Sequence, residues 1–329
     1  MRSRRSRRAK AEYALPAFAH LLALTAPLFL LVLLGYLLAH WGRWPREASD
    51  ALTRFVFSVA IPAFLFRLMA DFSRLPPVDA RLLIAYFGGC LVVFVLGRVI
   101  AATLFRLDGA SQSVFAVGGI FANLVLLGVP LTKVTLGDAA MPSASLVIVF
   151  NALLLWTLVT VSVEWARHRE LLAQRFARTA VSVVTNPVVA GILLGTAFGF
   201  TGLGLPPVVD ETLHLLSQPA IPMSLVVLGM GLSEYGIRTG WRQSVAIAVL
   251  KLAVAPLAVY LIARVLALPR LEMVTVVVMA SLPVGANVYL MAREFKTMEG
   301  PVASSLVLTT ALAAVTTPLL LALLGIAGT

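Results

Sequence analysis

The segment from Val114 to Gly137 reads VFAVGGIFANLVLLGVPLTKVTLG, and the segment from Met273 to Phe295 reads MVTVVVMASLPVGANVYLMAREF. Both are apolar and long enough to cross a membrane, yet both carry helix-breaking residues near the middle. The interrupting residues are Gly118, Gly119, Asn123, Gly128 and Pro130 in the first segment and Pro283, Gly285 and Asn287 in the second. A pair of interrupted spans at matching places in a chain is a strong sequence indication of a transporter binding site.

Breaking a helix inside a bilayer frees backbone N–H and C=O groups that lipid cannot satisfy. Such a break persists only where protein, water or a ligand supplies partners. Asn123 and Asn287 each precede an unbroken apolar run, so each is predicted to be an N-cap whose side-chain oxygen accepts from the following half-helix. Because helix N-termini attract anions, two crossing starts near the midplane predict an anion site. The alternative is that both asparagines only pack between helices.

Lys251 lies within another apolar run, nine residues beyond Arg242, or about 13 Å along a helix. A charge that deep usually faces a cavity or a partner, although a lysine can also snorkel to the surface. Asn151, Thr309 and Thr310 could line the same cavity or serve in polar packing. The predicted substrate-binding residues are Asn123, Asn287, Lys251, Gly128, Pro283 and Gly285, and the predicted hinge residues of the crossover are Ala122, Pro130 and Ala286.

Hydrophobic residues make up 60% of the 329 residues and charged residues 12%, and the mean hydropathy is +0.96. A chain this apolar must have lipid as much of its solvent. The net charge of +11 does not indicate nucleic acid, because the Lys and Arg residues lie in short loops between apolar runs. Ten stretches are predicted to be transmembrane helices: 21–41, 52–70, 82–104, 114–136, 143–163, 184–203, 212–233, 243–267, 272–292 and 302–325.

The second half of the chain repeats the first with an offset of 160 residues. Thr25, Pro27, Leu33, Leu34 and Gly35 recur as Thr185, Pro187, Leu193, Leu194 and Gly195, and Ala122-Asn123 recurs as Ala286-Asn287 at an offset of 164. Because five spans is an odd number, the second copy enters the membrane from the opposite side. The prediction is an all-α polytopic membrane protein of two inverted five-helix repeats, in which broken helices four and nine cross. Its segments are a basic tail (1–20), a first repeat (21–164), a joint (165–183) and a second repeat (184–329).

The joint contains Arg167, Arg169, Arg175 and Arg178, and basic loops remain in the cytoplasm. Both termini are then predicted to lie outside the cytoplasm. The Arg-rich tail before Ala9 conflicts with this orientation. Three alternatives remain open: the tail crosses despite its charge, the span count is off by one, or the start site is placed too early.

No Asp or Glu lies deep inside a predicted span, which argues against intramembrane aspartyl proteases and carboxylate-dependent proton antiporters. The four histidines are scattered, and Cys90 is the single cysteine, so neither a metal cluster nor a disulfide is predicted. We therefore expect no enzyme, no cofactor and no metal site.

The stretch from Asn123 to Lys133 (NLVLLGVPLTK) resembles the span-four signature of the auxin efflux carriers and their bacterial relatives. The stretch from Leu282 to Phe295 is similar to the span-nine signature of that family, and Lys251 before Pro256 resembles its span-eight pattern. The resemblance implies ten spans with the fold of the plant PIN-FORMED carriers, a scaffold and a transport domain, and elevator-type alternating access. It also implies export of carboxylate-bearing anions and, frequently, homodimers.

Ala122 and Asn287 stand where plant members of this family carry prolines, and the joint is much shorter than theirs. These differences favour the bacterial branch, whose members are associated with small dicarboxylates such as malonate or malate.

These features together predict a secondary transporter of the cell inner membrane that exports a small organic anion. The lipid bilayer is its other expected partner, and no nucleic-acid partner is expected. An inside-negative potential of roughly 100 mV favours anion exit by about 2.3 kcal/mol per charge. A sodium-coupled organic anion symporter of similar architecture is the first alternative, and a sodium gradient would drive it. A non-transporting membrane receptor is the second, and its ligand would bind without crossing.

Overall fold

A computed structural model describes residues 2–42, 44–71, 78–167, 185–234 and 240–326. Within these residues the chain consists of helices and loops, with a single isolated antiparallel bridge. Six helical segments are long and apolar enough to cross a membrane, and Leu124–Leu136 and Pro187–Gly199 are shorter apolar helices. The all-α fold is confirmed, whereas ten spans stay a prediction. The predicted joint at 165–183 lies almost entirely outside the described residues.

The helices follow the predicted spans closely. The first half contains α1 (Arg2–His40), α2 (Arg46–Phe55), η1 (Val56–Ala60), α3 (Ile61–Ala70), α4 (Arg81–Thr103), α5 (Gly109–Gly118), η3 (Leu124–Gly128), α6 (Val129–Leu136), η4 (Asp138–Ala140) and α7 (Met141–Arg167). The second half contains α9 (Pro187–Gly199), α10 (Pro207–Ser217), α11 (Ala220–Leu232), α12 (Trp241–Val249), η5 (Leu250–Val254), α13 (Ala255–Val265), α14 (Arg270–Ser281), α15 (Asn287–Glu294) and α16 (Glu299–Leu323).

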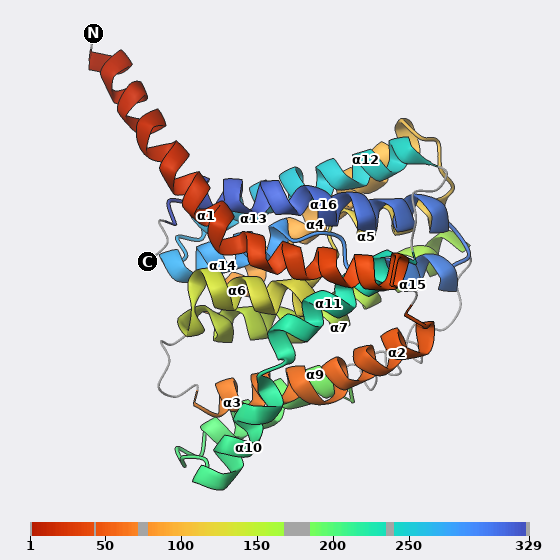
Figure 1. The fold of residues 1–329 in the computed structure, drawn as a ribbon. Coiled ribbons are helices and arrows are strands. Elements are labelled where there is room, and N and C mark those ends of the chain that lie inside the picture. The colour runs from red at the N-terminus through yellow and green to blue at the C-terminus, as the bar shows by residue number, and fades with distance from the viewer. Residues whose placement is uncertain (1, 43, 72–77, 168–184, 235–239, 327–329) are drawn as a thin grey trace.

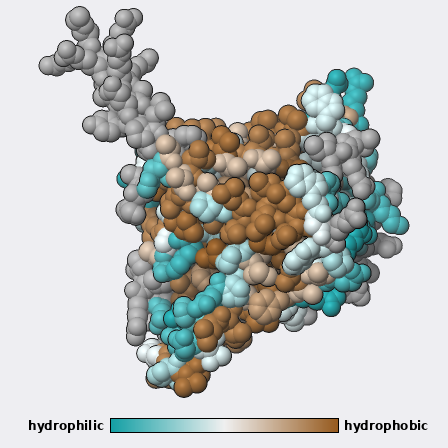
Figure 2. All heavy atoms as spheres, in the orientation of Figure 1, coloured by the Kyte–Doolittle hydropathy of each residue, from teal (hydrophilic) through white to brown (hydrophobic). Residues whose placement is uncertain are grey.

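The segment predicted as an N-terminal tail is helical from Arg2 and continues without a break into the first span. Figure 1 shows this part of α1 extending beyond the other helices. Hydrophobic side chains cover the middle of the face in Figure 2, over α1 and α16, and hydrophilic ones gather toward its right-hand edge. Leu30, Leu33 and Val315 are among the exposed apolar residues of these two helices, as expected of a surface that faces lipid.

The helices form two groups, which meet where α1 packs on α16 and α11 packs on η3. The first, here called the panel helices, consists of α1, α2, η1, α3, α9, α10 and α11, in which α1 packs on α11 and α3 packs on α9. The second, the crossover helices, contains α4 to α7 and α12 to α16. The panel helices α2, α3, α9 and α10 lie along the lower edge of Figure 1, and α11 runs diagonally toward the crossover helices.

Glycine permits the closest approaches among the panel helices. A Cβ atom at Gly35 of α1 would overlap the backbone of Val226 on α11, and one at Gly195 of α9 would overlap the backbone of Phe66 on α3. The two pairs correspond under the offset of 160 that relates the halves of the sequence. Small residues at such crossings let helices pack backbone to backbone, which is the main attraction available between helices in lipid.

In the described part of the chain, three helices widen into π-helical turns, each just before a proline: η1 before Pro62, η3 before Pro130 and η5 before Pro256. Because proline has no N–H, the carbonyl four residues earlier loses its helical donor. In η3 that carbonyl belongs to Leu126, and the hydroxyl of Ser224 on α11 donates to it over 3.1 Å. A panel helix thus supplies the partner that the proline removes from a crossover helix.

Replacing Gly229 by alanine should separate α1 from α11, because the added Cβ would overlap the carbonyl oxygen of Val32 and lie 2.7 Å from the amide nitrogen of Tyr36. Overpacking of this kind costs about 1–3 kcal/mol, so we expect a lower unfolding temperature in detergent. Gly231→Ala, on the same helix with open space around it, is the matched control and should be neutral or stabilising. Equal effects of the two substitutions would contradict the close packing.

Candidate functional site at the crossing of two broken helices

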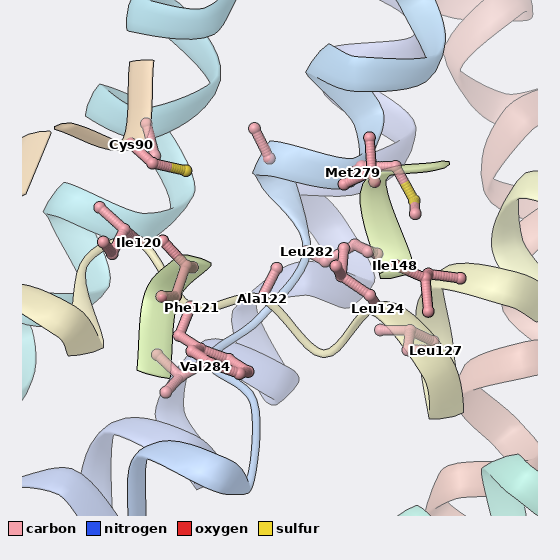
Figure 3. Close-up of a cluster of buried hydrophobic side chains, with 14 of the residues drawn as sticks. Cys90, Ile120, Phe121, Ala122, Leu124, Leu127, Ile148, Met279, Leu282 and Val284 are labelled. Atoms are coloured by element: carbon pink, nitrogen blue, oxygen red, sulfur yellow. The ribbon is translucent and has the colours of Figure 1, made fainter. Parts of the chain in front are cut away.

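Both interrupted segments are broken where the sequence predicts, and the two breaks cross. α5 ends at Gly118 and η3 begins at Leu124, while α14 ends at Ser281 and α15 begins at Asn287. Between them Ala122 and Val284 form the antiparallel bridge. Figure 3 shows the two unwound segments passing each other at these residues, with apolar side chains around them.

Each break supplies hydrogen-bond partners for the other. The amide of Asn123 donates to the carbonyl of Pro283 over 2.9 Å, and the amide of Gly285 donates to the carbonyl of Phe121 over 2.9 Å. The amide of Val284 donates to the hydroxyl of Thr309 on α16 over 3.1 Å. These groups are buried, and their bonds across the crossing replace the hydrogen bonds that lipid cannot provide.

Asn123 is the N-cap of η3, as predicted. Its Oδ1 accepts from the amide of Leu126 over 3.3 Å, and its carbonyl accepts from the amide of Gly128 over 3.0 Å. The helix that starts here continues through Pro130 to Leu136. The N–H groups of its first turn have no carbonyl partner within the helix, and they lie at the crossing.

The prediction that Asn287 is an N-cap is wrong. Asn287 is the first helical residue of α15, the N-cap position is held by Ala286, and no side chain caps this helix. The bridge hydrogen bonds explain the error, because Gly285 bonds to Phe121 in the same way that Asn123 bonds to Pro283, so Gly285 and not Asn287 is the counterpart of Asn123. Two residues, Gly285 and Ala286, separate the bridge from α15, whereas Asn123 alone separates it from η3. The side chain of Asn287 is exposed instead.

A cavity of about 170 Å³ adjoins the crossing, between the two groups of helices. The crossover helices and their breaks line it with Phe121, Ala122, Asn123, Leu124, Val125, Leu126, Ile148, Asn151, Gly285, Ala286 and Asn287, and the panel helices with Phe57, Asn186, Val188 and Val189. Its polar side chains are four asparagines. Both η3 and α15 begin at its wall, so two helix N-termini and four neutral amides surround one small space.

Two of the four asparagines come from other helices. Asn151 of α7 is 4% exposed, and its Oδ1 has no hydrogen-bond partner among the described residues. Asn186 caps α9, because its Oδ1 accepts from the amides of Val188 and Val189 over 2.9 and 3.4 Å. The sequence did not assign Asn186 to the site, although an asparagine before Pro187 is a typical helix start. Its nearness to Asn123 depends on packing between the halves of the chain.

Lys251 is fully buried in η5 but does not line this cavity. Its ammonium donates over 2.5 Å to the carbonyl of Ala280, in the last turn of α14. The last carbonyls of a helix lack intrahelical donors and carry partial negative charge, so the lysine stabilises the end of α14 just before the break. The ion pairs of the described residues do not include Lys251.

Gly128, Pro130 and Pro283 also lie outside the cavity lining. The amide of Gly128 and the carbonyl of Pro283 both bond to the backbone of Asn123, whereas Pro130 lies in the first turn of α6. Thr309 supports Val284, whereas Thr310 bonds to the carbonyl of Leu306 within α16. No cluster of three potential metal ligands occurs among the residues that the structure describes.

A family model described as membrane transport protein matches residues 20–321. The chain belongs to the auxin efflux carrier family of membrane transport proteins. A relative from Rhizobium meliloti, named as a candidate malonate transporter, is 26% identical over 306 residues, covering 91% of this chain and 94% of the relative. Auxin efflux carrier component 8 of Arabidopsis thaliana is 20% identical over 328 residues, covering 84% and 89%. An uncharacterised transporter of Methanocaldococcus jannaschii is 23% identical over 295 residues, covering 85% and 91%.

In this transporter, replacing Gly285 by alanine should weaken the crossing. The added Cβ would lie 2.9 Å from the carbonyl oxygen of Ala122 and 3.1 Å from the ring of Phe121, so the bridge must open. We expect a loss of about 1–3 kcal/mol, measured as a lower unfolding temperature in detergent. Gly204→Ala, at a glycine with open space around it, is the control. A transporter with Gly285→Ala that unfolds at the wild-type temperature would argue against a tight crossing.

Replacing Lys251 by methionine keeps an unbranched side chain, one atom shorter, but removes the donor to Ala280. An unsatisfied buried carbonyl costs about 1–3 kcal/mol, so the unfolding temperature should fall. Lys133→Met is the control, since its partner Asp138 is exposed and such pairs contribute about 0–1 kcal/mol. If both substitutions lower the temperature equally, Lys251 does not stabilise α14.

Proposed function

We propose that this member of the auxin efflux carrier family is a secondary transporter that exports a small organic anion, a carboxylate or dicarboxylate. The observation that carries the proposal is the cavity at the crossing, which lies between two groups of helices and contains four asparagines and two helix starts. Amide groups and helix N-termini bind negative charge without bringing a charge of their own into the membrane.

In this proposal the chain has ten spans in two inverted repeats, 21–164 and 184–329, joined by a cytoplasmic segment. The support is local. The contact of Gly35 with Val226 and that of Gly195 with Phe66 correspond at the repeat offset, and the two breaks meet in an antiparallel bridge. Both features are expected of repeats related by a two-fold axis in the membrane plane.

The proposed substrate is small. The cavity volume of about 170 Å³ is well below the roughly 300–1,000 Å³ of typical ligand pockets, which favours an anion of a few carbon atoms. The name of the Rhizobium meliloti relative favours malonate or a similar dicarboxylate. Asn123 and Asn287 would bind the carboxylate, with Asn151 and Asn186 completing the wall. Lys251 would offset part of the negative charge from beyond α14.

We propose that the crossover helices move against the panel helices, as in an elevator. The cavity wall contains residues of both groups, so relative movement would open and close it. The basic loops favour cytoplasmic placement of the joint and non-cytoplasmic termini in the inner membrane. An inside-negative membrane potential then drives anion exit without a coupling ion. A homodimer through the panel helices is compatible with this arrangement.

Transport by the purified protein in lipid vesicles tests the proposal. A panel of radiolabelled mono- and dicarboxylates, with malonate first, should give counterflow into preloaded vesicles. Flux that requires a sodium gradient would favour a symporter, and a carboxylate that binds without crossing would favour a receptor. Absence of both binding and flux across the panel would overturn the organic-anion proposal.

The substitution Asn123→Asp separates anion binding from folding. A carboxylate can still accept from the amide of Leu126, so the cap and the unfolding temperature should be retained. Two unit charges 4 Å apart repel by about 4 kcal/mol at an effective dielectric constant of 20, so dicarboxylate flux should fall at least about 100-fold. Gln243→Glu, the same amide-to-acid change in the first turn of α12, should leave flux unchanged. Wild-type flux by a folded Asn123→Asp protein would remove Asn123 from the site.

A further inference from the structure

A second concave surface lies on the crossover helices and shares no lining residue with the cavity at the crossing. It is a groove of about 1110 Å³ between α13, α14 and α16. Its walls are mainly apolar and open to the outside: Leu257, Leu319 and Leu323 are 56%, 47% and 76% exposed. A large apolar surface of this kind on a membrane protein indicates a contact with lipid or with another protein.

One end of this groove is basic. Arg264 lies in the last turn of α13, and Arg270 is the first residue of α14. Arg270 donates to the carbonyls of Leu324 and Gly325, just after the end of α16, over 3.5 and 3.0 Å. The ion pairs of the described residues include neither arginine. Two exposed guanidinium groups therefore lie at the mouth of an apolar groove, and neither is neutralised by an ion pair among the described residues.

The length of the groove matches one leaflet of a bilayer. Leu252 at its apolar end and Arg264 at its basic end lie twelve positions apart in η5 and α13, or about 18 Å along the helix. Half of a hydrocarbon core of about 30 Å is about 15 Å. The basic end would therefore lie at the height of the headgroups when Leu252 is near the midplane.

We propose that this groove binds an anionic phospholipid, with an acyl chain along α13 and α16 and the headgroup phosphate on Arg264 and Arg270. Guanidinium groups bind phosphate through paired hydrogen bonds, which a net negative headgroup strengthens. Free phosphate would leave the apolar walls uncovered, and a zwitterionic lipid would leave both positive charges without net compensation. Because all three walls belong to the crossover helices, the lipid would stabilise that group and move with it.

The test compares phosphatidylglycerol with phosphatidylcholine of the same acyl chains, added to the full-length protein in detergent. Native mass spectrometry should give tighter binding of phosphatidylglycerol, and thermal unfolding should give a larger upward shift with it. In the double variant Arg264→Gln, Arg270→Gln, the affinity for phosphatidylglycerol should fall about ten-fold or more, toward that for phosphatidylcholine. The variant Ala253→Phe should weaken both lipids, because the added ring would occupy the apolar end of the groove.

The control is the double variant Arg54→Gln, Arg293→Gln, which removes two exposed positive charges outside the groove and should retain the preference. The proposal is overturned if the two lipids bind equally to the wild-type protein, or if the groove variant keeps the full preference. It is also overturned if the variants change only the mass of the protein oligomer, since the groove would then be an interface between two copies. These outcomes do not depend on any transported substrate, so they leave the proposed anion transport to its own test.

Discussion

The structure depends on the mutual hydrogen bonding of two breaks that could not exist separately. A backbone amide or carbonyl left without a partner in hydrocarbon costs several kcal/mol, so a single broken span is unstable unless something crosses it. Here the unwound segment around Ala122 and the one around Val284 meet that need for each other. This reciprocity explains why both segments carry glycine or proline near the middle. It also fixes where two helix starts must lie, and hence where a cavity with positive polarity can form.

The crossing is not symmetric, and the difference matters for binding. The first break is capped by Asn123, whereas the second has Gly285 and Ala286 between the bridge and α15 and leaves Asn287 exposed at the cavity. The helix end that precedes the second break, at Ala280, is neutralised by Lys251. The positive charge of this lysine thus lies at the end of α14 and outside the cavity lining, whereas neutral amides face the cavity. An anion at the crossing would be held by dipoles, which bind it more weakly than a full charge and allow its release.

The sequence predicted the parts of this site that depend on local chemistry. Glycine and proline located both breaks, Asn123 was identified as a cap, and the depth of Lys251 indicated a buried partner. The sequence did not predict the register between the two breaks, nor the contacts between segments that lie far apart in the chain. Asn287 was aligned with Asn123 at an offset of 164, but the bridge relates the two breaks at 162, and such a shift changes which residue faces the crossing. Asn186 and Phe57 reach the cavity only because panel helices pack against the breaks, and nothing near them in the chain encodes that contact.

The same hydrogen bonds bear on how the cavity could open. Opening it by separating the two breaks would leave the amides of Asn123 and Gly285 and their acceptors unpaired in an apolar surrounding, at a cost of several kcal/mol. The boundary between the two groups has fewer backbone hydrogen bonds to lose in the proposed movement, because its contacts are mainly between side chains. Apolar side chains such as Phe29 and Val307 line the space where α1 faces α16, and the hydroxyl of Ser224 that serves Leu126 also lies within 2.8 Å of the carbonyl of Ile221 on its own helix. If the boundary slid, the serine would keep an acceptor, the carbonyl of Leu126 would lose one donor, and apolar contacts would be exchanged for similar ones. The proposed movement of the crossover helices as one body would keep the two hydrogen bonds of the crossing, which local unfolding at the site would break.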